Sequence, residues 1–163
     1  MVKGRIKAGE GTLVGNAGEH YVMAELLKRG VIAALASRNA PAFDILATKG
    51  NIDVRLRVKT KSEDYDIWQW NTHKDGTIFR LLNNERDFTV LVNLAMKSEN
   101  LRFYIVPSIQ LDKCLKADHA AWLAKRGKKG QKHSEANRKR HLNEKKHADV
   151  IASKLDAWDD LWK

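Results

Sequence analysis

The stretch from Pro41 to Lys61 constrains the fold of this chain most, because its residues alternate as they do in paired strands. Every second residue of each arm is apolar: Phe43, Ile45 and Ala47 in the first, and Val54, Leu56 and Val58 in the second. Between the arms, Lys49, Gly50 and Asn51 are typical of a tight turn. The stretch therefore predicts an antiparallel β-hairpin with one apolar face.

The other face of the second arm is a row of charged residues: Asp53, Arg55, Arg57, Lys59 and Lys61. We expect a four-residue turn that places Ala47 opposite Ile52. Asp44 then lies opposite Arg55, with Arg57 as its diagonal neighbour, roughly 7–8 Å away. Asp44 either forms a cross-strand salt bridge with these basic groups or holds a metal in a site where a lysine stabilises negative charge.

The size and composition favour a single globular domain over residues 1–163. The chain has a mass of 18.5 kDa, with 43% hydrophobic and 31% charged residues. Its one cysteine, Cys114, excludes an intrachain disulfide and a cysteine-cluster zinc site. The N-terminal residues lack the apolar core of a signal peptide, and the longest apolar run, Val31–Ala36, is too short to span a bilayer. We therefore expect a cytoplasmic protein without a membrane partner.

The formal net charge of +10 is concentrated in one stretch, residues 125–146, which we expect to be a basic insertion or loop. Ten Lys or Arg residues there stand against Glu135 and Glu144, which gives the stretch a net charge of +8. Such a concentration is typical of a surface that binds nucleic-acid phosphates, although a solvated segment without a partner is the alternative. The expected contacts from this stretch are Lys125, Arg126, Lys128, Lys129, Lys132, Arg138, Lys139 and Arg140.

Histidines occur in the same basic stretch, but they do not indicate a zinc site. His133, His141 and His147 have neither a cysteine nor clustered acids beside them in the sequence.

The remaining segments predict helices around further strands. Asn16 as N-cap and Glu19 as its capping-box partner predict a helix that ends at Gly30. Two apolar, β-rich runs at 88–95 and 101–106 predict central strands. A last helix is expected at about 148–162, with Ile151, Leu155 and Trp158 buried at helical spacing. The predicted class is α/β, a mixed sheet flanked by helices.

Four of these segments together resemble the PD-(D/E)XK nuclease superfamily, which includes restriction enzymes and Holliday-junction resolvases. They are Gly15–Glu19 with its helix, Pro41–Ile45, Arg57–Thr60 and the strand Phe103–Ser108. A tryptophan-containing C-terminal segment, Leu155–Trp158, also occurs in small bacterial members. The resemblance implies a restriction-endonuclease-like fold and does not cover residues 125–146.

The resemblance also implies roles for individual residues. Asp44 matches the metal-ligating aspartate, Lys59 the catalytic lysine, and Glu19 the first-helix acid of the resolvase-like branch, so that Glu19 and Asp44 would hold Mg²⁺ or Mn²⁺. Arg57 departs from the pattern, because the family has Glu or Gln two residues before the lysine. Either another acid replaces it, or the metal has been lost. The acids available for this are Glu19, Glu63, Asp64 and Asp66.

Two functional hypotheses follow. The first is a metal-dependent endonuclease that hydrolyses DNA phosphodiester bonds, in which Glu19, Asp44 and Lys59 are catalytic and Arg57 and Lys61 contact the DNA. The alternative is a catalytically inactive nucleic-acid-binding module on the same fold. A weaker hypothesis is an interaction protein whose basic stretch contacts an acidic partner. Cutting both strands of a duplex would favour a homodimer or a higher homo-oligomer.

Overall fold

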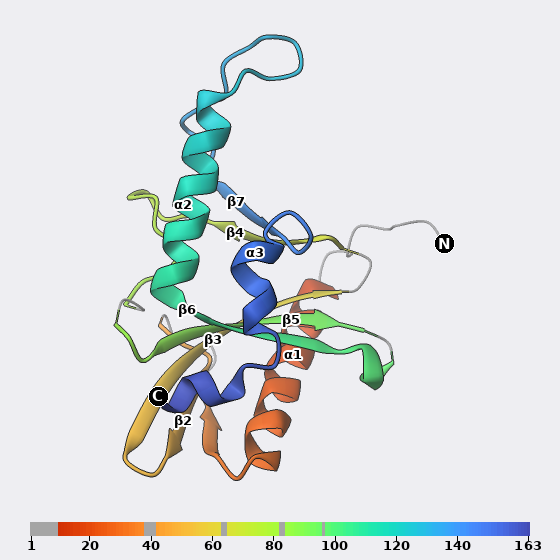
Figure 1. Ribbon diagram of the computed structural model, residues 1–163, viewed down its shortest axis with the longest axis vertical. Coiled ribbons are helices and arrows are strands. Elements are labelled where there is room, and N and C mark those ends of the chain that lie inside the picture. The colour runs from red at the N-terminus through yellow and green to blue at the C-terminus, as the bar shows by residue number, and fades with distance from the viewer. Residues whose placement is uncertain (1–9, 38–41, 63–64, 82–83, 96) are drawn as a thin grey trace.

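The computed structural model describes residues 10–37, 42–62, 65–81, 84–95 and 97–163. Its elements, in chain order, are α1 (Glu10–Lys28), β1 (Ile32–Leu35), β2 (Ile45–Lys49), β3 (Ile52–Ser62), β4 (Ile67–Asn71), β5 (Asp87–Leu94), η1 (Ser98–Asn100), β6 (Arg102–Pro107), α2 (Ser108–Ala124), β7 (Lys139–Asn143), α3 (Ala148–Ile151), η2 (Ala152–Lys154) and η3 (Trp158–Trp162). The predicted α/β class, a mixed sheet flanked by helices, is confirmed (Figure 1).

The main sheet has five strands in the order β1-β2-β3-β5-β6. The pairings are antiparallel except for the central one, in which β3 and β5 run parallel. The predicted strands at 88–95 and 101–106 are β5 and β6. A second sheet, which the sequence did not predict, pairs β4 with β7 and packs over one face of the main sheet.

The first helix begins at Glu10, before the predicted N-cap Asn16, so Asn16 and Glu19 lie inside the helix instead of capping it. The capping-box pattern suggested a later start, but an asparagine inside a helix costs only a few tenths of a kcal/mol, up to about 0.7, relative to alanine and does not end it. The C-terminal end of this helix is as predicted. Gly30 has φ +72°, and the N–H groups of Gly30 and Val31 donate to the carbonyls of Leu27 and Leu26 in a Schellman motif.

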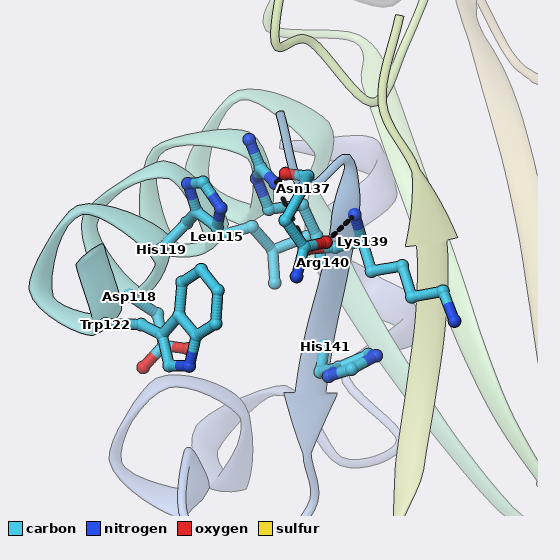
Figure 2. Close-up of a pocket in the computed structure, with 8 residues that line it drawn as sticks. All are labelled: Leu115, Asp118, His119, Trp122, Asn137, Lys139, Arg140 and His141. Carbon is cyan, nitrogen blue, oxygen red and sulfur yellow. Dashed lines mark hydrogen bonds between the residues drawn. The ribbon is translucent and has the colours of Figure 1, made fainter. Parts of the chain in front are cut away.

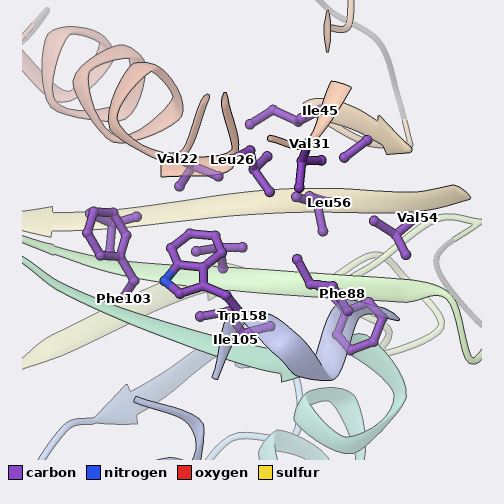
Figure 3. Close-up of a cluster of buried hydrophobic side chains, with 14 residues drawn as sticks. Val22, Leu26, Val31, Ile45, Val54, Leu56, Phe88, Phe103, Ile105 and Trp158 are labelled. Carbon is purple, nitrogen blue, oxygen red and sulfur yellow. The ribbon is translucent and has the colours of Figure 1, made fainter. Parts of the chain in front are cut away.

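Both faces of the sheet are covered, so the core has two halves. On one face, Val22 and Leu26 of α1 pack with Trp158 of η3 against β2, β3 and β5 (Figure 3). On the other face, α2, α3 and the β4–β7 sheet bury a second cluster around Trp68 and Leu91. Strand β5 is buried along nearly its whole length because its residues alternate between these two clusters.

The C-terminal segment does not form the single helix expected at 148–162. Instead, α3 and η2 are followed by a break at Asp156, which has φ +49°, and the chain resumes as η3. The break has a structural cause, because the Asp156 N–H donates to the Phe103 carbonyl on the edge strand β6. Ile151 and Trp158 are buried as predicted, whereas the prediction for Leu155 was wrong, since it is 44% exposed.

Candidate active site

The register of the β2–β3 hairpin determines which basic residue meets Asp44. Lys49 pairs with Ile52 and Ile45 with Leu56, so the turn consists of Gly50 and Asn51 alone. Gly50 has φ +60°, which a two-residue type II′ turn requires at its first position. The predicted four-residue turn was therefore wrong, and Asp44 lies beside Arg57 instead of Arg55.

Arg55 belongs to a different contact. Its guanidinium forms a two-pronged ion pair with the buried Asp87 at the start of β5, with N–O distances of 2.7 and 2.8 Å. This pair joins the two parallel central strands, and we assign it a structural role.

The Asp44 carboxylate is held by two groups on β3. One oxygen accepts a 2.8 Å hydrogen bond from the backbone N–H of Val58, and the other lies 3.3 Å from a guanidinium nitrogen of Arg57. The Asp44 backbone N–H donates to the Leu56 carbonyl at 2.9 Å, which fixes the residue at the end of the ladder. Its carboxylate therefore has a fixed position beside β3.

Glu19 reaches this carboxylate from α1 because the helix lies unusually close to β3. A Cβ atom at Gly18 would lie 1.9 Å from Oγ1 of Thr60, so only glycine permits this approach. Burial, and after it the charge of Asp44, raise the pKa of Glu19, while His20 and Arg57 partly offset the rise. The two carboxylates thus repel each other across the site.

Lys59 lies on the same face of β3 as Arg57, two residues farther along the strand. Burial lowers the pKa of Lys59, the Arg57 charge lowers it further, and Asp44 acts in the opposite direction. The ammonium group also lies 5.7 Å from the ring centroid of Trp70 on β4. The structure therefore brings Glu19, Asp44, Arg57 and Lys59 into one electrostatically coupled group.

We tested whether these residues suit a divalent metal. In the described part of the chain, no group of three or more His, Cys, Asp or Glu is arranged to hold one, so Glu19 and Asp44 offer a pair of carboxylates. Mg²⁺ commonly takes one or two carboxylates and completes its shell with water and substrate phosphates. Burial and then the charge of Asp44 raise the pKa of Glu19, and a bound cation would offset both. Arg57 is 37% exposed, and a long ion pair at such a position contributes little to stability. A metal could therefore displace the guanidinium from Asp44, and the two carboxylates fit Mg²⁺ or Mn²⁺.

The other acids considered as metal ligands do not add to this pair. Glu63 and Asp64 lie outside the described residues. Asp66 lies near Lys61 instead, where its charge acts on the pKa of that lysine.

The structure places Lys61 in the interior, away from any surface that a nucleic acid could contact. The residue is 4% exposed, and its ammonium group lies 2.8 Å from a carboxylate oxygen of Glu144. Glu144 also accepts hydrogen bonds from Asn93, Arg102 and Tyr104. No spacing in the sequence pointed to this network, because its members lie far apart along the chain.

The basic stretch has two structural parts. Residues 125–138 extend beyond the end of α2 as a narrow projection, the basic tip, seen at the top of Figure 1. The ring of His133 stacks on that of Trp122 at 3.9 Å and holds the tip against the helix. The expected nucleic-acid contacts Lys125, Arg126, Lys128, Lys129, Lys132 and Arg138 are exposed there, as is Lys139 at the start of β7. Arg140 is the exception, because it is buried.

Comparison with known proteins gives structural matches only. No family model and no curated protein matches the sequence. The fold is similar to that of the bacterial homing endonuclease I-Ssp6803I, with a TM-score of 0.49 and 18% identity over 91% of this chain and 88% of that one. It is also similar to Hjc, a Holliday junction resolvase from Archaeoglobus fulgidus, with a TM-score of 0.49 and 13% identity over 90% and 94% of the two chains.

The second of these, a Holliday junction resolvase, is of a kind that the sequence resemblance named. At these TM-scores and identities, we base the function on the residues of the site itself. In the described part of the chain, no helix is long and apolar enough to cross a membrane.

Proposed function

We propose that this protein is a metal-dependent endonuclease that hydrolyses DNA phosphodiester bonds. One observation carries the proposal: two mutually repelling carboxylates, Glu19 and Asp44, lie beside a half-buried lysine, Lys59. A salt bridge alone would need only Asp44 and Arg57. In the described part of the chain, no hydrogen bond or ion pair accounts for the second acid or for the desolvated lysine, whereas phosphodiester hydrolysis uses both.

Glu19 and Asp44 would hold a Mg²⁺ or Mn²⁺ ion, which would polarise the phosphate and lower the pKa of a bound water. Lys59 would orient the attacking water or stabilise the negative charge that develops on the phosphate oxygens. Arg57, already exposed at the rim of the site, would turn from Asp44 towards a phosphate of the strand. The basic tip would bind the DNA backbone away from the site.

The test is a cleavage assay on plasmid and branched DNA with Mg²⁺ or Mn²⁺. We expect the wild type to cut, and Asp44→Ala and Lys59→Ala each to abolish cutting while DNA affinity stays within about twofold, because backbone anchoring uses other residues. Cleavage that survives Asp44→Ala at the wild-type rate would overturn the catalytic assignment.

One observation favours a second candidate, a catalytically inactive DNA-binding module. The contact between Arg57 and Asp44 is the pairing expected if the guanidinium has taken the place of a metal. In that case the wild type binds no Mg²⁺, and Arg57→Glu creates a metal site by adding a third carboxylate. Metal titration of the two proteins therefore separates the candidates.

A further inference from the structure

A cavity of about 130 Å³ lies between α2 and β7, away from the carboxylate pair (Figure 2). Its wall includes Trp122 and His119 from the helix and Asn137 and Arg140 from the returning chain. Arg140 lies opposite Trp70 in the β4–β7 ladder, and Trp70 in turn neighbours Lys59. The cavity is therefore on the same side of the main sheet as Lys59.

Arg140 is a buried charge without an ion pair. The residue is 9% exposed, and in the described part of the chain no carboxylate lies within 4.0 Å of its guanidinium. One terminal nitrogen donates to the carbonyls of Asn137 and Lys139, but Nε has no hydrogen-bond partner. Burial lowers the pKa of Arg140, and the charge of Asp112, beyond ion-pair distance, acts in the opposite direction. One Asp112 oxygen lies 2.6 Å from Lys116, and the other has no hydrogen-bond partner among the described residues. A buried guanidinium in this state is stabilised by an anion.

A second side chain with an unpartnered nitrogen faces the same cavity. The ring of His119 stacks on Trp122, and its Nε2 is buried without a hydrogen bond. Asp118 is the one acid in the wall, and its carboxylate is already bound by Lys146 at 2.5 Å and lies 3.5 Å from His147. The groups left to bind a ligand are therefore Arg140, His119 and Asn137, which favour an acceptor-rich, negatively charged partner.

We propose that this cavity binds a terminal phosphate of a nucleic-acid strand. A volume of about 130 Å³ is large enough for a phosphate group. A terminal phosphate is a monoester with three non-bridging oxygens for these donors, whereas a phosphodiester within a strand has two. The monoester also carries a charge of about −1.5 to −2, which better compensates the buried guanidinium. The nucleic-acid part of this inference rests on the proposed function.

The test compares the affinity of the full-length protein for one oligonucleotide with either a phosphate or a hydroxyl at its 5′ or 3′ end. We expect the wild type to bind one phosphorylated form about tenfold more tightly. Arg140→Gln should remove this preference, while Arg138→Gln, an exposed change two residues away, should weaken all forms equally and leave the preference intact. Inorganic phosphate should also shift the NMR signals of the His119 ring in the wild type and not in Arg140→Gln.

Each other outcome would overturn the inference. Equal affinity for phosphorylated and hydroxyl ends would exclude end recognition. A preference that survives Arg140→Gln would place the end-binding site outside this cavity. Arg140→Lys, which keeps the charge, controls for misfolding and should retain part of the preference. Cutting of closed circular DNA, which has no ends, does not require an end-binding cavity, so failure of that activity and failure of end binding can be told apart.

Discussion

At the scale of single residues, Arg57 and Gly18 decide what the site can do. Arg57 supplies a cation where the sequence resemblance predicts an acid, and it makes a partly exposed contact of 3.3 Å with Asp44. Gly18 lets α1 approach β3 closely enough for Glu19 to interact with Asp44. The proposed metal site therefore depends on a residue that carries no chemistry of its own.

Replacing Gly18 by alanine should destabilise the protein and displace Glu19. The new methyl group would lie 1.9 Å from Thr60 Oγ1, and such overpacking typically costs about 1–3 kcal/mol. Gly15→Ala is the matched control, because nothing lies within 4 Å of its Cβ position and the helix should gain about 0.5–1 kcal/mol. Denaturant unfolding measures both, and equal effects of the two changes would contradict the close approach.

At the scale of elements, alternation was sufficient to predict the β2–β3 hairpin but not its register. A shift of two residues keeps every side chain on the same face, so the pattern of apolar residues cannot detect it. Because of this error, Arg55 was predicted as the partner of Asp44, whereas the structure places Arg57 there. Asp44 and Lys59 were named as site residues because of the resemblance to a known motif, and the structure places them in one electrostatically coupled group with Glu19 and Arg57.

Local sequence patterns could not predict the β4–β7 sheet or the break in the C-terminal helical segment. Their strands and turns are determined by partners far away in sequence, such as the Phe103 carbonyl that binds Asp156. Short segments of this kind have weak local preferences, and tertiary contacts decide their structure.

The C-terminal η3 should contribute strongly to stability through one side chain. Trp158 is 3% exposed, packs on Phe103 at 5.5 Å and lies beneath the Arg29 guanidinium. Trp158→Ala should therefore lower the free energy of unfolding by about 3–5 kcal/mol. Trp162→Ala, at a partly buried position in the same element, should cost clearly less. A smaller loss at Trp158 than at Trp162 in chemical denaturation would contradict this packing.

The basic tip should dominate the salt dependence of DNA binding. Deleting residues 125–146 would also remove β7 with the buried Leu142, so neutralising Lys128, Lys129 and Lys132 to Gln is the cleaner change. The slope of log affinity against log salt should become shallower by about 0.9 for each DNA phosphate that the tip no longer neutralises.

The same three changes at exposed lysines outside the tip (Lys74, Lys97 and Lys113) are the control and should alter the slope less. Equal slopes for the two triple variants would remove the tip from the interface.

At the scale of the whole molecule, buried charged side chains connect the β4–β7 sheet to the main sheet. Glu144, just after β7, accepts hydrogen bonds from β5 and β6 and pairs with Lys61 of β3. These bonds outweigh the cost of burial and lower the pKa of Glu144 to about 2, whereas burial lowers the pKa of Lys61 despite its partner. The network therefore stabilises the charged carboxylate and joins the second sheet to the first.

This network predicts how stability depends on pH. Since the pKa of Glu144 falls from its ordinary 4.5 to about 2 on folding, its contribution is complete above pH 4.5 and is lost as the pH falls towards 2. The shift corresponds to about 3 kcal/mol. Glu144→Gln should flatten the acid limb of the unfolding free energy plotted against pH. If the acid limb is unchanged in the variant, other groups cause the pH dependence of the unfolding free energy.

The most direct test of the account is calorimetric titration of Mg²⁺ into the wild type, Glu19→Gln, Asp44→Asn and Arg57→Glu. The account predicts that the wild type binds the ion, that either loss of a carboxylate abolishes binding, and that Arg57→Glu binds more tightly, because it replaces a competing cation with a ligand. Binding by Arg57→Glu alone, with none by the wild type, would contradict the metal site and leave the protein a DNA-binding module.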